Sequence, residues 1–360
     1  MVDPDRIKVG VIGTGGIAQY LHLKQYLEYK DAQVVALCDM QEEALAATQR
    51  RWELEDVATF TDAKAMFAEV DLDAVSICTP NDSHRDLALA AIEAGLAVLC
   101  EKPLALNASQ AREMVEAAEG ADVVNMTGFS KRFFPAARLA QSLIQEGELG
   151  EIYALEGHYV QGWGLNPDVP LVWRLQRGRA GSGALGDLGS HLFDLARWWV
   201  GEAAEVVALT RTFISERPLP QGQGMGMVDV DDHVGFVVQF QKSAMGTFTA
   251  SRVAGPIQDD CRLTAHGSQG SLIFTTQQRD TLQVCLGQAM LRLHTFTTVE
   301  VPWEYRNVDE IPAFVQAVRA GTPVEPSFLD GLRCQELLDA VLESVETGRR
   351  VTLPQFPSRI

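Results

Sequence analysis

The first third of the chain alternates short apolar runs with longer stretches of helix-forming residues, and this alternation strongly limits the possible folds. The stretches between the runs are rich in Ala, Leu, Glu and Gln, which favour helix. They span residues 17–29, 41–51, 83–94 and 107–118. The runs are continuously apolar and span residues 7–12, 34–38, 74–78, 97–100 and 123–126. Continuous apolar strands alternating with helices predict a parallel sheet covered on both faces, in an α/β fold.

After about residue 130 the pattern changes to longer strand-like segments joined by glycine-bearing turns. These segments span 152–161, 206–213, 235–241, 245–252, 261–265, 271–275, 282–286 and 290–295. Adjacent strands with short turns predict a mainly antiparallel sheet. Helices are predicted at 135–146, 186–200, 309–320 and 330–347, and the Pro-, Gly- and Gln-rich stretch Arg217–Met227 is predicted to be a mobile surface loop.

A length of 360 residues favours two domains. We expect residues 1–126 to form a nucleotide-binding domain with the parallel sheet. Residues 127–360 are expected to form a second α/β domain with a mainly antiparallel sheet.

The charge balance and the cysteines narrow the class of protein. A net charge of -18 without a basic patch argues against nucleic acid as a partner. The six cysteines show neither C-x-x-C pairs nor zinc spacing, so reduced thiols and no metal site are expected. The start lacks the apolar core of a signal peptide, and no apolar run approaches the ~20 residues of a membrane span. A cytoplasmic protein that does not contact membranes is therefore expected.

A glycine-rich turn follows the first apolar run and opens the first helix. Its sequence, Gly13-x-Gly15-x-x-Ala18, has the spacing of a dinucleotide-binding fingerprint in the required strand–helix context. Small residues let backbone N–H groups approach a pyrophosphate at the positive end of a helix. The turn predicts cofactor contacts at Gly13, Gly15, Gly16 and Ile17.

Asp39 ends the second strand, 26 positions after Gly13 (39 minus 13). A carboxylate there can accept hydrogen bonds from the adenosine ribose hydroxyls and would repel a 2′-phosphate. The following residues 40–43 supply no cation for such a phosphate. The cofactor is therefore expected to be NAD rather than NADP; a simple helix cap at Asp39 is the alternative.

Polar residues also follow the strand at 74–78. Loops at the carboxyl ends of parallel strands line the cofactor crevice. Cofactor contacts are therefore predicted for Thr79, Pro80, Asn81 and His84. For Asn81, a plain helix cap is an equally good interpretation.

Glu101-Lys102-Pro103 follows the strand at 97–100 directly. Pro103 restricts the backbone beside the lysine. A cation at the carboxyl end of a strand can polarise a substrate oxygen or lower the pKa of a hydroxyl. We predict cofactor contacts at Glu101 and Lys102 and a catalytic role for Lys102, with a salt-bridged structural lysine as the alternative.

Asp187 and His191 lie four positions apart, and Asp194 follows three later, so all three can share one helical face. Imidazole suits proton transfer near neutral pH, and a neighbouring carboxylate can fix its tautomer or stabilise its cation. The apolar stripe expected to face the core is Leu188, Leu192, Leu195 and Trp199. A structural His–Asp pair is the alternative interpretation, and a zinc site lacks a third ligand at suitable spacing.

The glycines just before this helix are a separate feature. They follow the pattern Gly181-x-Gly183-x-x-Gly186. Glycines permit a close backbone approach, as at a bound cofactor.

Together these motifs resemble those of the Gfo/Idh/MocA oxidoreductases. The resemblance covers nearly the whole chain and rests on the glycine turn, Thr79-Pro80-Asn81, Glu101-Lys102-Pro103, residues 128–135, Trp173-Arg174, Asp187 with His191, and Asp231-Asp232. It implies a Rossmann domain followed by an α/β domain whose open sheet packs against its equivalent in homodimers or homotetramers.

The resemblance also implies hydride transfer between a nicotinamide and a sugar, polyol or cyclitol hydroxyl. Lys102, Asp187 and His191 fall on the catalytic positions of the family. Phe129 and Phe133 occupy a stretch where many members carry tyrosine, so this stretch supplies no phenolic proton donor.

These inferences predict an NAD-dependent dehydrogenase that oxidises a secondary alcohol of a sugar, anhydrosugar or inositol-like cyclitol. We expect His191 to take the hydroxyl proton, Asp187 to orient it, and Lys102 to hydrogen-bond the same oxygen. The assignment of the base between Lys102 and His191 stays open, because coupled groups titrate together.

The substrate pocket is predicted to include Gln161, Trp163 and Arg174, besides Asp187 and His191. Indole stacks on apolar sugar faces, and amide and guanidinium groups read hydroxyls. Two other functions are open from the sequence: a glycoside hydrolase that uses bound NAD in a transient oxidation–elimination cycle, and a non-catalytic NAD sensor.

Overall fold

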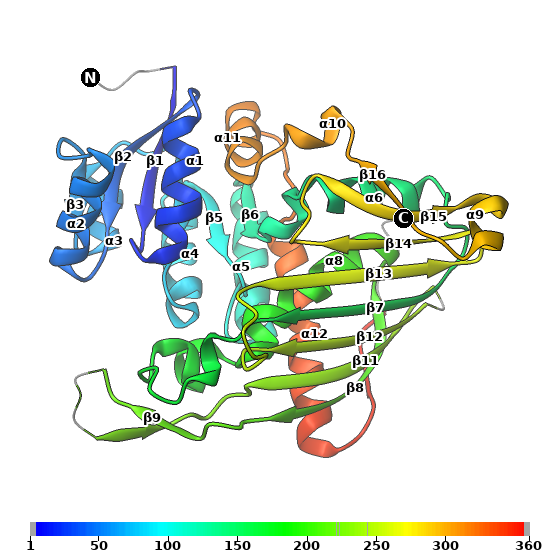
Figure 1. Ribbon diagram of the computed structural model, residues 1–360. Coiled ribbons are helices and arrows are strands. Elements are labelled where there is room, and N and C mark those ends of the chain that lie inside the picture. Colours follow the sequence, from blue (N-terminus) through cyan, green and yellow to red (C-terminus); the bar gives the residue numbers. More distant parts are fainter. Residues whose placement is uncertain (1–4, 221, 223, 243, 356–360) are drawn as a thin grey trace. The chain divides into compact units, whose positions relative to one another are not determined.

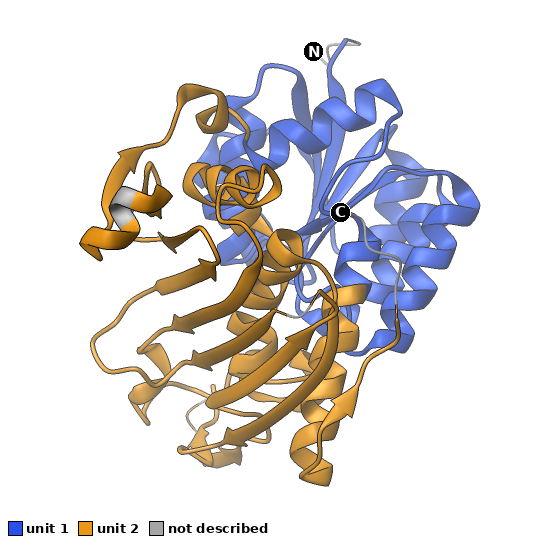
Figure 2. Ribbon diagram, turned by 90° about the vertical axis from the view of Figure 1, so that its right-hand side faces the viewer, with its two compact units in different colours: residues 1–128, 309–332 blue, residues 129–308, 333–360 orange. Residues whose placement is uncertain are grey.

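The computed structural model describes residues 5–220, 222, 224–242 and 244–355. The chain forms two compact units (Figure 2). Unit 1 contains residues 1–128 and 309–332, and unit 2 contains residues 129–308 and 333–360.

Unit 1 is built on a six-stranded parallel sheet in the order β3-β2-β1-β4-β5-β6 (Figure 1). The strands are β1 (Ile7–Ile12), β2 (Ala32–Cys38), β3 (Ala58–Phe60), β4 (Ala74–Ile77), β5 (Ala97–Glu101) and β6 (Asn125–Gly128). This order places β1 beside β4, so the chain reverses its direction of travel across the sheet at that point. The predicted parallel sheet is confirmed.

Helices follow the strands of unit 1 as the alternating pattern predicts. They are a π-helical turn η1 (Ala18–His22), α1 (Leu23–Glu28), α2 (Glu42–Trp52), α3 (Ala63–Glu69), a 3₁₀ turn η2 (Asn81–Ser83), α4 (His84–Glu93), α5 (Ala108–Ala121) and α11 (Glu310–Ala320). Small and apolar side chains of α3, α4 and α5 form one buried cluster with the strands. The sequence analysis missed β3 and α3, although Asp62 caps α3 by accepting hydrogen bonds from the N–H groups of Lys64 and Ala65.

One segment departs from the predicted domain division, which assigned everything after residue 126 to the second domain. Residues 309–332 belong to unit 1. In α11, the Ile311 N–H donates to Gln25 Oε1 at 3.1 Å, and Arg319 forms an ion pair with Asp31 at 3.1 Å. Phe314 of the same helix is fully buried. These contacts span nearly 300 positions, so local patterns do not reveal them.

Unit 2 is built on a nine-stranded sheet in the order β16-β15-β14-β13-β7-β12-β11-β8-β17. The strands are β7 (Ile152–Val160), β8 (Ala203–Arg211), β11 (His233–Phe240), β12 (Met245–Ser251), β13 (Asp260–Gly267), β14 (Gly270–Thr275), β15 (Thr281–Leu286), β16 (Thr297–Glu300) and β17 (Val351–Thr352). Every pair of neighbours is antiparallel except β7 and β12. The prediction of a mainly antiparallel sheet is confirmed.

The helices of unit 2 include several short turns. They are η3 (Ser130–Phe133), α6 (Pro135–Gln145), η4 (Trp163–Leu165), η5 (Trp173–Leu175), α7 (Arg177–Ala180), the π-helical turn η6 (Leu185–Gly189), α8 (Ser190–Val200), α9 (Gly287–Leu293) and α10 (Trp303–Arg306). α12 (Phe328–Thr347) begins in unit 1 and continues in unit 2. No helix among the described residues has the length and apolar character that crossing a membrane requires.

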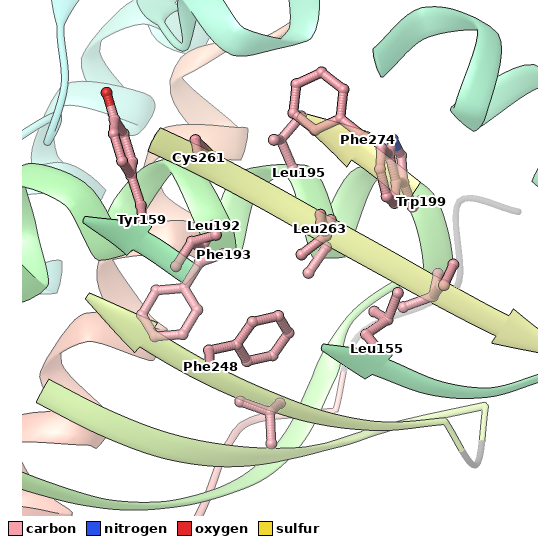
Figure 3. Packing of buried hydrophobic residues seen from close by; sticks show 14 of the residues in the cluster. Leu155, Tyr159, Leu192, Phe193, Leu195, Trp199, Phe248, Cys261, Leu263 and Phe274 are labelled. Atoms are coloured by element: carbon pink, nitrogen blue, oxygen red, sulfur yellow. The ribbon is translucent and has the colours of Figure 1, made fainter. Parts of the chain in front are cut away.

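One face of the large sheet packs on α8. The predicted apolar stripe is confirmed, since Leu188, Leu192, Leu195 and Trp199 are at most 2% exposed. Figure 3 shows Phe248 of β12 in the same buried layer as the side chains of α8. The rings of Phe248 and Phe236 stack with centroids 5.2 Å apart.

Two predictions about unit 2 are wrong. The segment 290–295, predicted as a strand, lies largely in α9 (Gly287–Leu293), because Gln, Ala, Met, Leu and Arg are strong helix formers. The stretch Arg217–Met227, predicted as a loop, contributes to a hairpin of β9 (Glu216–Pro218) and β10 (Met225–Met227). The predicted mobility concerns, in part, Gln221 and Gln223, which lie outside the described residues.

The hairpin is held by a buried cation. The guanidinium of Arg217 is buried and donates to the carbonyl oxygens of Gly164 and Asn166. Arg217 therefore connects β9 to the turn that carries Trp163.

We predict that Phe248→Ala lowers the free energy of unfolding of unit 2 by about 3–5 kcal/mol, because the substitution leaves a cavity in a packed aromatic layer. Thr247→Ala, one position earlier and on the exposed face of β12, should cost less than about 0.5 kcal/mol. Urea denaturation followed by tryptophan fluorescence measures both, since all tryptophans except Trp52 lie in unit 2. Equal losses for the two variants would contradict this packing.

Candidate active site

The glycine turn of unit 1 leaves its backbone open at the start of a helix. Gly13 has a φ of +84°, and a Cβ there would lie 2.9 Å from the backbone of Cys78. At Gly15, by contrast, no atom of the described chain beyond its own neighbours lies within 4 Å of where a Cβ would be. Gly16 and Ile17 directly precede η1. This open N-terminus fits the pyrophosphate of a dinucleotide.

Asp39 connects this turn to the end of β2. Its Oδ2 accepts hydrogen bonds from the Thr14 N–H at 2.8 Å and the Thr14 Oγ1 at 2.9 Å, and its Oδ1 accepts from the Gln41 N–H at 3.0 Å. Asp39 thus lies beside the glycines, as the ribose-binding prediction requires. It also holds the residue at which α2 is capped, so the two interpretations of Asp39 are compatible.

The loop after β4 is internally bonded. The Ser83 hydroxyl donates to Thr79 Oγ1 at 2.7 Å, and Pro80 precedes η2, where Asn81 is buried. The ring nitrogens of His84 lie 3.0 Å from the carbonyl oxygens of Thr79 and Pro103. Burial lowers the pKa of His84. Its side chain therefore ties the Thr79 loop to the Lys102 loop, and a direct cofactor contact by this ring stays a prediction.

A buried polar network lies behind Lys102. His22 Nε2 is 2.9 Å from Glu101 Oε1, and His22 Nδ1 is 3.3 Å from the hydroxyl of Ser76. The Ser76 hydroxyl is 2.7 Å from the phenol of Tyr26. Because a carboxylate only accepts, the proton between His22 and Glu101 lies on Nε2. The sequence analysis missed His22, Ser76 and Tyr26.

Glu101 connects this hydrogen-bonded network to the backbone of Lys102. Its Oε2 accepts a hydrogen bond from the Lys102 N–H at 3.2 Å. Burial alone would raise the pKa of Glu101, but the hydrogen bond from His22 and the charges of His22 and Lys102 lower it below its ordinary value. A Cβ at Gly128 would lie 3.0 Å from Glu101 Oε1, so glycine leaves room for this carboxylate. The carboxylate is therefore ionised and fixes the backbone that carries Lys102.

In unit 2, Asp187 and His191 lie on the helical segment formed by η6 and α8. π-Helical turns often occur at functional sites. The Oδ2 of Asp187 lies 3.8 Å from Arg174 Nε and 3.9 Å from Arg252 Nη2. The side chain of Asp187 is therefore placed between two guanidinium groups.

Arg252, which the sequence analysis missed, connects three of the predicted residues. Besides its ion pair with Asp187, its Nη1 donates to the carbonyl oxygen of Arg174 at 3.0 Å. Its guanidinium lies 5.2 Å from the ring centroid of Trp163. Unit 2 thus brings Trp163, Arg174 and Asp187 together around one buried cation.

His191 lies between aromatic rings. Its ring centroid is 5.7 Å from that of Tyr159 and 6.3 Å from that of Phe129. The Tyr159 phenol is absent from the sequence-based list of site residues. Burial, followed by the charge of Asp259, raises the pKa of Tyr159, so this phenol stays protonated.

Gln161 is linked through Asp259 to Tyr159, the neighbour of His191. Both the Tyr159 hydroxyl and the Gln161 side-chain amide donate to Asp259 Oδ1, at 2.8 and 2.7 Å. Asp259 also borders an open cavity of about 520 Å³, whose lining residues are Ile257, Gln258, Asp259, Asp260, Thr276 and Gln277. Gln161 therefore joins the side of the site that contains His191.

At Gly183, one of the three glycines before η6, the structure shows a close approach within the chain. A Cβ at Gly183 would lie 1.8 Å from the carbonyl oxygen of Asp231, so the close approach there is to the chain itself and not to a cofactor. The Asp231 carboxylate accepts hydrogen bonds from the N–H groups of Gly183 at 2.7 Å and Leu185 at 2.8 Å. Asp231 therefore fixes the start of the turn that carries Asp187.

Asp194, predicted to share a face with His191, pairs with a buried arginine. Arg132 donates two hydrogen bonds to Asp194, at 2.8 and 2.6 Å. Both side chains are at most 4% exposed. The pair anchors the first turns of α8 to η3 below His191.

Comparisons with known proteins match both parts of the chain. A model described as an oxidoreductase family with an NAD-binding Rossmann fold matches residues 7–129. A model of the GFO/IDH/MocA C-terminal domain matches residues 137–273.

Individual relatives align over most of their length. The chain is 35% identical over 344 residues to levoglucosan dehydrogenase of Pseudarthrobacter phenanthrenivorans, covering 87% of this chain and 88% of that protein. It is 30% identical over 349 residues to inositol 2-dehydrogenase of Rhizobium meliloti, covering 96% and 99%. A solved structure of levoglucosan dehydrogenase in complex with NADH and levoglucosan has a TM-score of 0.90 at 33% identity, covering 97% of this chain and 100% of that one.

We predict that Glu101→Gln lowers the stability of the fold at pH 7 by about 1–3 kcal/mol, because it removes a charged hydrogen-bond acceptor from a buried site. The pKa of Glu101 lies below its ordinary value of 4.5, so its contribution is complete above that pH. It is lost as the pH falls through the lower folded-state value. Urea unfolding at pH 7 and at lower pH should therefore show a difference that shrinks with acidification.

Glu93→Gln, at an exposed position, is the matched control and should change little at any pH. A difference for Glu101→Gln that stays constant down to acid pH would contradict an ionised, paired Glu101.

Proposed function

The chain belongs to the Gfo/Idh/MocA family of oxidoreductases, and from this membership we propose that it oxidises a secondary hydroxyl of a sugar, anhydrosugar or cyclitol. The family predicted from the motifs is confirmed. The chain is an NAD-binding dehydrogenase that acts on CH–OH groups. The oxidised carbon and the individual substrate are the finer parts of the proposal.

We propose that NAD is held by Gly13, Gly15, Gly16 and Ile17, with Asp39 on the adenosine ribose. The open backbone at Gly15 and the bonded position of Asp39 support this assignment. The loop containing Thr79, Pro80 and Asn81 and the Glu101–Lys102 segment complete the proposed set, in which His84 acts through these loops. NAD, when bound, supplies a nicotinamide ring that accepts a hydride.

The proposed catalytic residues are Lys102, Asp187 and His191. His191 accepts the hydroxyl proton as the C–H bond of the alcohol breaks, and Asp187 supports the charge that develops on the imidazole. Lys102 donates a hydrogen bond to the reacting oxygen and stabilises its alkoxide character. Which of Lys102 and His191 holds the proton is a property of the coupled groups.

The group around Arg252 is the observation that carries the choice of substrate class. Trp163 offers an indole ring and lies against Arg252, and Arg174 offers guanidinium donors beside Asp187. Aromatic faces with charged and amide groups suit a polyhydroxylated ring. Relatives named levoglucosan dehydrogenase and inositol 2-dehydrogenase favour an anhydrosugar or a cyclitol.

We test this with a panel of inositols, aldoses and anhydrosugars, following NADH absorbance with NAD and NADP in parallel. Turnover with NAD is expected for at least one compound, and Asp39 should make NADP the poorer cofactor. For that compound, Lys102→Ala and His191→Ala should lower kcat by about 10²–10⁴-fold, because proton transfer and oxyanion stabilisation contribute that much. The His191→Ala variant should keep NADH binding, measured by fluorescence titration.

Full turnover in the His191→Ala variant would contradict its proposed role. Silence of the unmodified protein across the panel, with NADH still bound, would contradict the proposed activity. A glycosidase assay without net NADH formation would then test the oxidation–elimination alternative.

We also propose that the chain forms a homodimer or homotetramer through the large sheet. The face opposite α8 carries exposed apolar side chains at Val207, Leu209, Val237 and Met245, on the adjacent strands β8, β11 and β12. Light scattering should give a mass of two or four chains, and Leu209→Lys should shift it toward one. A monomer in the unmodified protein would contradict this.

All six cysteines are buried and free, which supports the proposed cytoplasmic location.

A further inference from the structure

The carboxylate of Asp259 holds two residues on the His191 side of the site. Its Oδ1 accepts hydrogen bonds from the Tyr159 hydroxyl at 2.8 Å and from Gln161 Nε2 at 2.7 Å. Its Oδ2 lies 3.9 Å from the ammonium group of Lys131. A carboxylate accepts hydrogen bonds, so the Tyr159 hydroxyl and the Gln161 amide both act as donors to Asp259, while Lys131 contributes a positive charge at ion-pair distance.

This commitment determines what Gln161 can offer to a ligand. A side-chain amide has one NH₂ group that donates and one oxygen that accepts. With one N–H of this group on Asp259, the NH₂ end of the amide is turned toward the carboxylate, and Oε1, on the opposite branch, is the acceptor that the amide offers to a ligand. The main chain of Gln161 is fixed as well, since its N–H donates to Ser251 O at 2.8 Å and its carbonyl accepts from Ala254 at 2.9 Å.

We propose that Asp259 is a positioning residue that turns the Gln161 amide so that Oε1 accepts a hydrogen bond from a substrate hydroxyl. This inference rests on the proposed function, in which Gln161 contacts the substrate. The Tyr159 ring that shares Asp259 lies 5.7 Å from the His191 ring, centroid to centroid, so the cluster borders the proposed base. Asp259 therefore selects substrates whose hydroxyl donates at this position.

Substrate analogues distinguish a hydroxyl that donates from one that accepts. Replacing the substrate hydroxyl that meets Gln161 by hydrogen removes both abilities, whereas replacing it by fluorine keeps only a weak ability to accept. If Gln161 Oε1 accepts from the substrate, both analogues at that carbon should lose kcat/KM by roughly fivefold to tenfold. If the amide donated instead, the fluoro compound would keep most of its activity.

The experiment measures kcat/KM for the best substrate of the panel and for its monodeoxy and monodeoxyfluoro analogues. In Asp259→Ala the amide is free to rotate, so the fluoro compound should recover by about threefold or more relative to the parent substrate.

Gln161→Glu alone places two carboxylates in contact and should weaken activity. The double variant Gln161→Glu/Asp259→Asn reverses the polarity of the pair, because the new amide donates to the new carboxylate. Its second carboxylate oxygen still accepts, so the original discrimination should return.

Asp260→Asn is the matched control. Asp260 adjoins Asp259 in sequence but contacts His158 at 3.2 Å and Thr275 at 3.4 Å. It should keep the discrimination of the unmodified protein. NADH binding, measured by fluorescence, shows whether each variant is folded. Because the Asp259 side chain is half-exposed, we expect its substitution to leave folding intact.

Loss of discrimination in Asp259→Ala, with its return in the double variant, supports the inference. Unchanged discrimination in Asp259→Ala overturns it, as does an equal change in Asp260→Asn. If these variants overturn the inference while a sugar is still turned over, the proposed function is unaffected. Absence of turnover with every sugar and cyclitol overturns the proposed function and this inference together.

Discussion

Asp231 accepts hydrogen bonds from the backbone N–H groups of Gly183 and Leu185, and this contact determines where the helical segment carrying Asp187 and His191 begins. The same device recurs at two other segments of the proposed site. Asp39 holds the glycine turn, and Glu101 holds the backbone of Lys102. A carboxylate can receive several N–H groups at once, and such charge-assisted bonds are stronger than neutral ones. These carboxylates therefore fix the backbone at the glycine turn, at Lys102 and before Asp187.

The cations of unit 2 complement these carboxylates. Arg252 is buried yet reaches Asp187, the carbonyl oxygen of Arg174 and the ring of Trp163. Arg132 pairs with Asp194 beneath His191. Removing one partner of such a buried pair costs several kcal/mol, because the remaining charge loses its compensation. The positions of the proposed catalytic and substrate-binding side chains thus depend on residues that need not touch substrate.

Local patterns predicted much of this from the sequence. The glycine turn, the acid at the end of β2 and the apolar stripe of α8 are each visible within a few residues, since they follow from strand and helix periodicity. Long-range partners were missed for a physical reason. Glu101 meets His22 from 79 positions away, and Tyr159 meets Asp259 from 100 positions away. Such pairs follow from tertiary packing, as does the return of α11 to unit 1. At Gly183 the residue pattern alone did not reveal the close approach to Asp231, because room for a ligand and room for Asp231 require the same residue.

The central claim is that the chain moves a hydride from a sugar or cyclitol carbon while its own side chains take the hydroxyl proton. The most direct measurement uses a substrate deuterated at the oxidised carbon and proton NMR of the reduced cofactor. One deuterium on C4 of the nicotinamide ring is expected for each ketone formed. A ketone product with unlabelled NADH, or consumption of the sugar without NADH, would contradict it.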